Sequence, residues 1–263
     1  MADDSRTTEA RLRLAPALRR AGGLCVLTGA GMSAESGIPT FRDALTGHWA
    51  HFDPMELASE DGFRANPQRV WDWYAERREG VRRAEPNAGH RALAAFAQAY
   101  PGVLTLVTQN VDNLHQRAGN ADTIRLHGDI LEDRWLDPCR RHAQGGNVCD
   151  PAWAEGSHPP RCADCDNPLR PGVVWFGEPL PIAAATAAQR AAERCAVMLV
   201  VGTSGAVWPA AGLAGRARAT GATVLILNPE ISEIDAEAHL VLRGTAAGLL
   251  PRLLAPFEQG SLA

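Results

Sequence analysis

A glycine-rich turn directly after a short apolar run is the first part of this sequence whose residue types can do chemistry. The run Leu24–Thr28 consists mostly of β-favouring residues and breaks into Gly29-x-Gly31-x-x-Ala34. A buried parallel strand that ends in such a turn lets the backbone approach a phosphate closely. We interpret the turn, with Ala30 at its centre, as a nucleotide-binding element, although the motif is a loose one and turns of this composition are often only turns.

The continuation of this turn differs from an ordinary dinucleotide-binding unit. Such a unit needs a helix that runs well beyond the third small residue, whereas Gly37-Ile38-Pro39 stops a helix within about two turns, because proline lacks a backbone donor and disfavours helix before it. We expect the chain to turn back toward the nucleotide and to carry Thr40, Phe41 and Arg42 with it. The early proline makes an NAD-dependent dehydrogenase the least favoured enzyme class.

Four further apolar runs are each followed by small or polar residues. We expect strands at residues 104–108, 123–126, 197–201 and 224–227. The residues that follow them are, in turn, Gln109, Asn110 and Asp112; His127; Gly202, Thr203 and Ser204; and Asn228. Because ligands in open parallel sheets bind beyond the carboxyl ends of the strands, these side chains are candidates for one common site.

His127 is the best catalytic candidate among these residues. Its imidazole can accept a proton near neutral pH, and it lies directly after an expected strand with Gly128 beside it. A lone histidine is more often structural, so the residues alone leave both interpretations open.

Composition and charge restrict the remaining possibilities. A chain of 263 residues with 46% hydrophobic and 21% charged residues can form one sizeable α/β domain with a small satellite. The net charge of −4 and the pI near 6.1 provide no basic field for nucleic acid. No apolar run approaches the roughly 18 residues of a membrane helix, and no apolar segment follows the polar start. We therefore expect a cytoplasmic protein that binds neither nucleic acid nor membrane, and we favour a monomer.

The strand and helix rhythm is interrupted twice. Helical stretches are expected at 6–21, 54–59 and 67–83, and the aromatic residues between 44 and 85 form either core or an apolar tunnel. Residues 130–172 are rich in Pro, Gly and Cys, and a strand is expected to resume at 173–178. Four of the six cysteines lie between 139 and 165, which favours a metal site over disulfides in a cytoplasmic protein.

The sequence GAGMSAESGIPTFR, residues 29–42, resembles the signature of the sirtuins, the NAD-dependent protein lysine deacylases. Thr108–Asp112 is similar to the family segment that lines the nicotinamide and ribose pocket, and Leu126-His127-Gly128 to the motif of its general base. The resemblance implies that an acyl-lysine oxygen attacks the ribose of NAD, nicotinamide leaves, and His127 then takes a proton from a ribose hydroxyl. That hydroxyl would attack the resulting imidate, and water would complete the transfer to give free lysine and 2'-O-acyl-ADP-ribose.

The resemblance also implies a set of NAD contacts. Asn110 would hold the ribose and a water, Asp112 the nicotinamide carboxamide, and Asn228 the adenosine ribose. The phosphates would lie on the backbone donors of residues 29–31 and on Ser204. The implied contacts are those of Gly29, Ala30, Gly31, Ala34, Glu35, Thr40, Phe41, Arg42, Gln109, Asn110, Asp112, His127, Gly202, Thr203, Ser204, Asn228 and Ala246.

A second group of residues resembles the acyl-lysine site of the desuccinylase class of sirtuins. Tyr74 and Arg77, at i and i+3 of an expected helix, would hold the carboxylate of a succinyl, malonyl or glutaryl group, and Ala58 would widen the pocket. Without the resemblance, a packed tyrosine beside a solvated arginine is the simpler interpretation. The family's substrate strand, which pairs with the target peptide, is matched by Val174, Trp175, Phe176, Gly177 and Glu178; a simple core strand is the alternative.

The cysteine-rich module departs from the family pattern of two Cys-x-x-Cys pairs. Only the second pair, Cys162 and Cys165, is present, and Trp135 and Pro138 occupy the usual places of the first. Tetrahedral zinc takes thiolate or imidazole ligands. We expect a structural zinc on Cys139, Cys149, Cys162 and Cys165, with His142 as a possible substitute and loss of zinc as the alternative.

Taken together, we predict an α/β fold: a Rossmann-like doubly wound parallel sheet with a small zinc-ribbon-like module and a helical insertion. The NAD-binding domain would comprise residues 1–43, 86–129 and 173–263, the helical insertion 44–85, and the metal module 130–172. The expected function is NAD-dependent removal of succinyl, malonyl, glutaryl and acetyl groups from protein lysines. A protein ADP-ribosyltransferase and a silent NAD or ADP-ribose sensor on the same fold are the alternatives.

Overall fold

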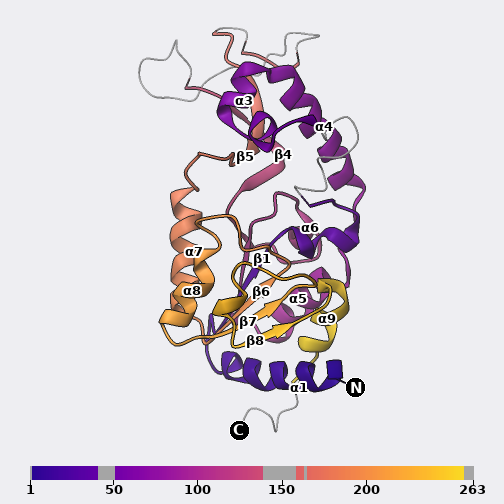
Figure 1. Cartoon of the computed structure of the whole chain (residues 1–263), viewed down its shortest axis with the longest axis vertical. Coiled ribbons are helices and arrows are strands. Elements are labelled where there is room, and N and C mark those ends of the chain that lie inside the picture. Colours follow the sequence, from indigo (N-terminus) through magenta and orange to yellow (C-terminus); the bar gives the residue numbers. More distant parts are fainter. Residues whose placement is uncertain (1, 41–50, 139–157, 163–164, 258–263) are drawn as a thin grey trace. The chain divides into compact units, whose positions relative to one another are not determined.

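The computed structural model describes residues 2–40, 51–138, 158–162 and 165–257 (Figure 1). The chain divides into two compact units. The first unit consists of Met1–Phe41, Ala84–Leu126 and Leu180–Ala263, and the second of Arg42–Arg83 and His127–Pro179. Segments 44–85 and 130–172, for which we expected a helical insertion and a metal module, thus fall largely in the second unit; that division of the chain stays a prediction.

The first unit contains a parallel sheet of six strands in the order β3-β2-β1-β6-β7-β8. The strands are β1 (Leu24–Thr28), β2 (Leu104–Thr108), β3 (Ile124–Arg125), β6 (Val197–Val201), β7 (Thr223–Leu227) and β8 (Leu240–Leu242). The five strands expected from the apolar runs are present, and β8 was not anticipated because it has only three residues. The strand order reverses between β1 and β6, and a ligand site is expected at such a switch point.

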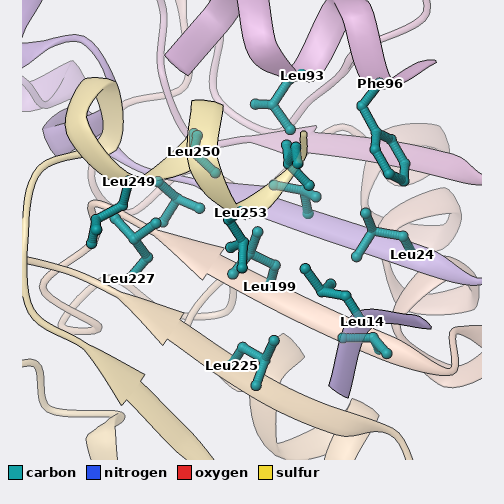
Figure 2. Packing of buried hydrophobic residues seen from close by; sticks show 14 of the residues in the cluster. Leu14, Leu24, Leu93, Phe96, Leu199, Leu225, Leu227, Leu249, Leu250 and Leu253 are labelled. Atoms are coloured by element: carbon teal, nitrogen blue, oxygen red, sulfur yellow. The ribbon is translucent and has the colours of Figure 1, made fainter. Parts of the chain in front are cut away.

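Helices cover both faces of this sheet, which confirms the doubly wound Rossmann-like fold. Figure 2 shows one face, where Leu24 and Leu199 pack with Leu93, Leu250 and other leucines. The helices on this face are α1 (Ala2–Leu14), α5 (Ala88–Ala99) and α9 (Ala246–Leu253); those on the other are α7 (Ile182–Arg194) and α8 (Gly212–Ala219). Neighbouring side chains of one strand alternate between the two cores, so a fully apolar strand is buried on both sides.

Prolines and glycines limit the length of helical structure at two places in the first unit. The expected helix at 6–21 begins earlier and ends at Leu14, after which a 3₁₀ turn, Ala15–Arg19, carries Pro16 in its first positions. After β1 the chain forms only the 3₁₀ turns Ala30–Met32 and Ala34–Ser36. The helical conformation ends at Gly37, which has a φ of 82°. This confirms the prediction that no long helix forms between β1 and Pro39. Two further short elements are α6 (Leu114–Arg117) and a 3₁₀ turn at Asp235–Glu237.

The second unit combines helices with a two-stranded antiparallel sheet. Its elements are α2 (Pro54–Leu57), α3 (Glu60–Ala65), α4 (Pro67–Arg83), β4 (Gly128–Trp135) and β5 (Leu169–Val173). Arg78 fastens α4 to β4: its Nε donates to the carbonyl of Ile130 at 2.6 Å, and its guanidinium pairs with Asp133. Among the described residues no helix has both the length and the apolar composition needed to cross a membrane.

The expected strand at 173–178 is wrong beyond its first residue. β5 ends at Val173, and Phe176 forms only an isolated parallel bridge with Ser59. The physical reason is a local turn. The amide of Glu178 donates to the carbonyl of Trp175 at 3.1 Å, the Glu178 carboxylate accepts from the Trp175 amide at 2.8 Å, and Gly177 has φ of 86°. Extended backbone cannot make these bonds.

Candidate active site

A buried polar cluster follows β1 and β2, next to the switch point that lies between β1 and β6. The hydroxyl of Ser33 donates to the Asp112 carboxylate at 2.9 Å and accepts from the Asn110 side chain at 3.2 Å. Asp112 also accepts from the backbone amide of Leu114 at 3.0 Å. All three side chains are at least nine-tenths buried. A buried carboxylate and a buried amide held in fixed geometry can orient a polar ligand. Asn110 and Asp112 thus lie together beyond the carboxyl end of β2, as the sequence predicted.

His90 supports this cluster from α5. Its Nδ1 accepts from the backbone amide of Asn87 at 3.3 Å, so the proton of the neutral ring belongs on Nε2, which lies 3.5 Å from the Ser33 hydroxyl. Burial, and secondarily the charge of Arg91, lowers the pKa of His90 to about 4. The ring is therefore neutral at physiological pH.

His115, on α6, lies next to His90 and bonds to the end of β1. The Thr28 hydroxyl donates to Thr108 at 2.8 Å, so the His115 Nε2, at 3.0 Å from Thr28, must be the donor to that oxygen. The hydroxyl of Thr108 in turn accepts from the backbone amide of Asn110 at 3.0 Å. Burial, helped by the neighbouring His90, lowers the pKa of His115 to about 3. The two imidazoles meet edge to face with centroids 4.8 Å apart.

Neither His90 nor His115 was predicted to have a role in the site. A usable signal existed for His90, because Asn87 stands three residues before it and the two form a capping box at the start of α5. No comparable signal marks His115, whose ring contacts residues of two distant elements, β1 and α5.

The glycines of the predicted nucleotide turn pack against the loop after β6. A Cβ on Gly31 would lie 2.8 Å from Cα of Gly202, and Gly202 itself has φ of 62°. The amides of Gly29 and Gly31 donate to the carbonyls of Val201 and Gly202 at 2.9 and 2.8 Å. A phosphate on these two amides would therefore compete with bonds that hold the turn together, and close backbone approach is the clearer reason for the glycines.

Three other residues of the implied NAD set make hydrogen bonds that link the segments around this turn. The Gln109 side chain donates to the Thr203 hydroxyl at 3.2 Å, and Asn228 donates to the Thr203 carbonyl at 3.3 Å. Glu35 accepts from the amide of Ala247 at 2.8 Å, in the first turn of α9 beside the buried Ala246. Ser204 is exposed. Phe41 and Arg42 lie outside the described residues.

His127 begins the second segment of the second unit, directly before β4. Its side chain is half-buried, and its carbonyl accepts from the amide of Val174 at 2.9 Å. Gly128 follows with φ of 80°, and a Cβ there would lie 2.1 Å from the Gly172 carbonyl oxygen. Only glycine fits this close approach of β4 to β5, so the backbone that carries His127 is fixed to Val174 and the end of β5.

The residues assigned to the acyl pocket meet within the second unit. Tyr74 is 3% exposed, and its hydroxyl accepts from the Trp175 indole Nε1 at 3.1 Å. The Arg77 guanidinium lies over the rings of Trp73 and Tyr74, 4.6 and 5.6 Å from their centroids. Burial raises the pKa of Tyr74, with the charge of Arg77 opposing it, so the phenol keeps its proton. The carbonyl of Ala58 accepts from the amide of Phe176 at 2.9 Å.

The indole of Trp175 packs against a buried ion pair. Arg170, only 2% exposed, binds the Glu178 carboxylate and places its guanidinium 3.3 Å from the centroid of the Trp175 ring. Burial lowers the pKa of Arg170 and by itself would raise that of Glu178, but hydrogen bonds from Arg170 and the Trp175 amide leave the Glu178 pKa below its usual value. Both groups therefore stay charged. Removing one partner of such a buried pair typically costs about 3 to 5 kcal/mol.

Of the expected zinc ligands, only the second cysteine pair lies in the described part of the chain. Cys162 is buried, Cys165 is half-buried, and Cys165 and Trp135 both pack against Cys162. The amide of Asp166 donates to the Cys162 carbonyl at 2.9 Å, which holds the residue after Cys165 close to Cys162. Cys139, His142 and Cys149 are outside the described residues, and no group of three or more metal-binding side chains occurs among those described.

A cavity of about 420 Å³ opens beside Cys165 and Asp166. Arg64, Asp137 and Cys165 are among its lining residues, and neither Tyr74 nor Arg77 lines it. It is therefore separate from the expected acyl pocket.

Comparison with known proteins places the chain in a family. The model of the Sir2 family matches residues 29–209. An NAD-dependent protein deacylase of Ralstonia nicotianae is 55% identical over 230 residues, which cover 88% of this chain and 90% of the relative. A solved Sir2 homologue in complex with NAD has a TM-score of 0.77 at 38% identity, covering 92% of this chain and 91% of the other. The structure of Sir2Tm bound to a propionylated peptide has a TM-score of 0.73 at 31% identity and covers 94% and 96% of the two chains. The chain therefore belongs to the Sir2 family of NAD-dependent protein deacylases.

Proposed function

We propose that this protein removes short acyl groups that end in a carboxylate, such as succinyl, malonyl or glutaryl, from protein lysines, and that it removes acetyl groups less efficiently. NAD is the co-substrate, and the products are free lysine, nicotinamide and 2'-O-acyl-ADP-ribose. The proposal extends the family's deacylase activity to a particular class of acyl group.

The pairing of Tyr74 with Arg77 is the observation that carries this proposal. Both side chains project from one face of α4, and a protonated phenol beside a guanidinium offers two donor groups to one carboxylate. An arginine fork can bind a carboxylate bidentately, and a charge-assisted bond of this kind contributes about 1.5 to 3 kcal/mol. An acetyl group has no carboxylate and leaves these donors unused.

The polar cluster next to the switch point fits a nicotinamide riboside. The Asp112 carboxylate can accept from a carboxamide, and the Asn110 amide can donate to a ribose oxygen, while Ser33 and the neutral His90 keep both side chains in place. Ordered, buried polar groups of this kind are the ones that fix a ligand's orientation. His127 is the group we assign to proton abstraction from the ribose hydroxyl, because imidazole is the side chain that titrates nearest to neutral pH.

A structural zinc is part of the same proposal. Two thiolates at Cys-x-x-Cys spacing, as at Cys162 and Cys165, supply half of a tetrahedral set, which Cys139 and Cys149 or His142 would complete. Zinc bound there would hold the cysteine-rich loops together and would take no part in the reaction.

One assay tests the proposed function. The protein is incubated with NAD and with peptides that carry succinyl-lysine, malonyl-lysine or acetyl-lysine, and nicotinamide, free lysine and O-acyl-ADP-ribose are measured together. The chain itself contains no lysine, so all free lysine comes from the peptide. We expect the three products in equal amounts and a higher kcat/KM for the dicarboxylic peptides.

The rival functions give different product patterns. Nicotinamide with ADP-ribose attached to protein, but without free lysine, would identify a transferase. NAD binding without turnover would identify a sensor. A kcat/KM for acetyl-lysine above that for succinyl-lysine would contradict the proposed acyl class while leaving the deacylase activity in place.

A further inference from the structure

The contact between Trp175 and Tyr74 sets the direction of a hydrogen bond. An indole nitrogen can only donate, so in the 3.1 Å contact the Tyr74 oxygen is the acceptor. A phenol has one proton, and with this lone pair occupied the proton must point away from the indole. The hydroxyl of Tyr74 is thereby oriented as a donor toward another group. Accepting one hydrogen bond also strengthens a hydroxyl as a donor.

The indole that imposes this direction is itself held on several sides. Its ring lies on the Arg170 guanidinium and packs against Phe63 with centroids 5.3 Å apart. Its backbone amide donates to Glu178, and the next residue, Phe176, donates to the carbonyl of Ala58. Trp175 is 2% exposed, so rotating the ring would break buried contacts. The indole is therefore a rigid reference for the Tyr74 hydroxyl.

We propose that Trp175 is a positioning residue for acyl-chain selectivity: by donating to Tyr74 it directs the phenol proton toward the carboxylate of a dicarboxylic acyl-lysine, beside Arg77. This inference rests on the proposed function. It assigns Trp175 a task separate from pairing with the substrate peptide, because an indole that only lined the pocket would serve acetyl and succinyl chains alike.

The test is a double-mutant cycle on selectivity. The ratio of kcat/KM for succinyl-lysine to that for acetyl-lysine is measured for wild type, Trp175→Phe, Tyr74→Phe and the double variant. Loss of one oriented hydrogen bond is expected to lower the ratio about 3- to 10-fold in Trp175→Phe. In the Tyr74→Phe background the same substitution should leave the ratio unchanged, because the hydroxyl through which Trp175 acts is gone.

Two further variants separate the hydrogen bond from the shape of the indole. Replacing Trp175 by 3-benzothienylalanine keeps a bicyclic ring of similar shape and removes the N–H, so it should lower the ratio as Trp175→Phe does. Phe63→Leu disturbs the packing of the same ring but keeps the N–H, so the ratio should stay within about 2-fold of wild type.

The outcomes distinguish this inference from the proposed function on which it rests. A wild-type ratio below one overturns both. A wild-type ratio above one that the benzothienyl variant does not lower overturns only the role of Trp175. The same holds if Trp175→Phe lowers the ratio as much in the Tyr74→Phe background as in wild type.

Discussion

The Nε2 of His115 lies 3.0 Å from the hydroxyl oxygen of Thr28 and can only be its donor, because the Thr28 proton is committed to Thr108. Nδ1 of the same ring has no hydrogen-bond partner in the described part of the chain. A second proton on this ring would be buried without an acceptor beside the equally buried His90. The pair is built to remain neutral.

This arrangement predicts a loss of stability in mild acid. The folded-state pKa values of His90 and His115 are lowered from 6.5 to about 4 and about 3. Between pH 6.5 and 4 the unfolded chain therefore binds more protons than the folded one, so stability is full above pH 6.5 and falls as the pH falls. From pH 7 to 5 each histidine should cost about 2 kcal/mol of unfolding free energy.

Urea unfolding at pH 7 and pH 5 measures this effect. His115→Gln is expected to be less stable than wild type at pH 7 but to lose about 2 kcal/mol less between the two pH values, because glutamine does not titrate. His51→Gln, a change at an exposed position, should leave the pH dependence as in wild type. An equal loss in all three proteins would attribute the acid sensitivity to other groups.

The contrast between β1 and this histidine pair shows what the sequence could predict. The strands were predicted because each is a short apolar run. The early end of the helical turns before Pro39 was predicted from the chemistry of proline. Both are local properties. The partners of the His115 ring come from β1 and α5, so its environment exists only after folding and no local pattern marks it.

The incorrect strand at 173–178 has the same origin. Val173–Phe176 has strand-like composition, and β-propensity depends strongly on context. The Glu178 carboxylate instead binds the Trp175 amide and Arg170, which closes a turn that the residue types did not reveal. The hydrogen bonds from the Gly29 and Gly31 amides to Val201 and Gly202 could not be predicted for the same reason, because their acceptors are distant in the sequence.

His127→Ala tests the assignment of the general base. We expect kcat/KM for deacylation to fall about 10²- to 10⁴-fold, the usual effect of removing such a base. The Kd for NAD, measured by calorimetry, should change little, because the polar cluster of the first unit does not include this side chain. His51→Ala is the matched control, with wild-type turnover expected. Turnover of His127→Ala within a few-fold of wild type would remove this residue from the mechanism.

The metal proposal predicts about one zinc per chain, bound through thiolates at roughly 2.3 Å. Elemental analysis of protein purified without chelator measures it. Cys162→Ala and Cys165→Ala should lose the zinc and lower the Tm by about 2 to 4 °C for each kcal/mol lost. Cys195→Ala, a change in the core of the first unit, should keep it. Zinc-free wild-type protein would show that the departure from the two-pair pattern abolished the site.

Arg77→Met tests the proposed recognition of the acyl carboxylate. Methionine keeps most of the apolar stem that lies along Trp73 and Tyr74 and removes the charged fork. A charge-assisted bond of about 1.5 to 3 kcal/mol corresponds to about 10- to 100-fold in rate. We therefore expect kcat/KM for succinyl-lysine to fall about 10- to 100-fold more than kcat/KM for acetyl-lysine, which makes no use of the guanidinium.

Arg82→Met is the matched control for this prediction. Arg82 lies on the same helix, but its side chain is 54% exposed and pairs with Glu79 at the surface. Its replacement removes the same charge from α4, so any long-range electrostatic effect on a negatively charged peptide is shared, whereas a specific bond to the acyl carboxylate is not. The ratio of the two kcat/KM values should therefore stay at the wild-type level in Arg82→Met and fall only in Arg77→Met. Equal falls in the two variants would show that Arg77 acts as general positive charge, and an unchanged ratio in Arg77→Met would leave Tyr74 without its proposed partner.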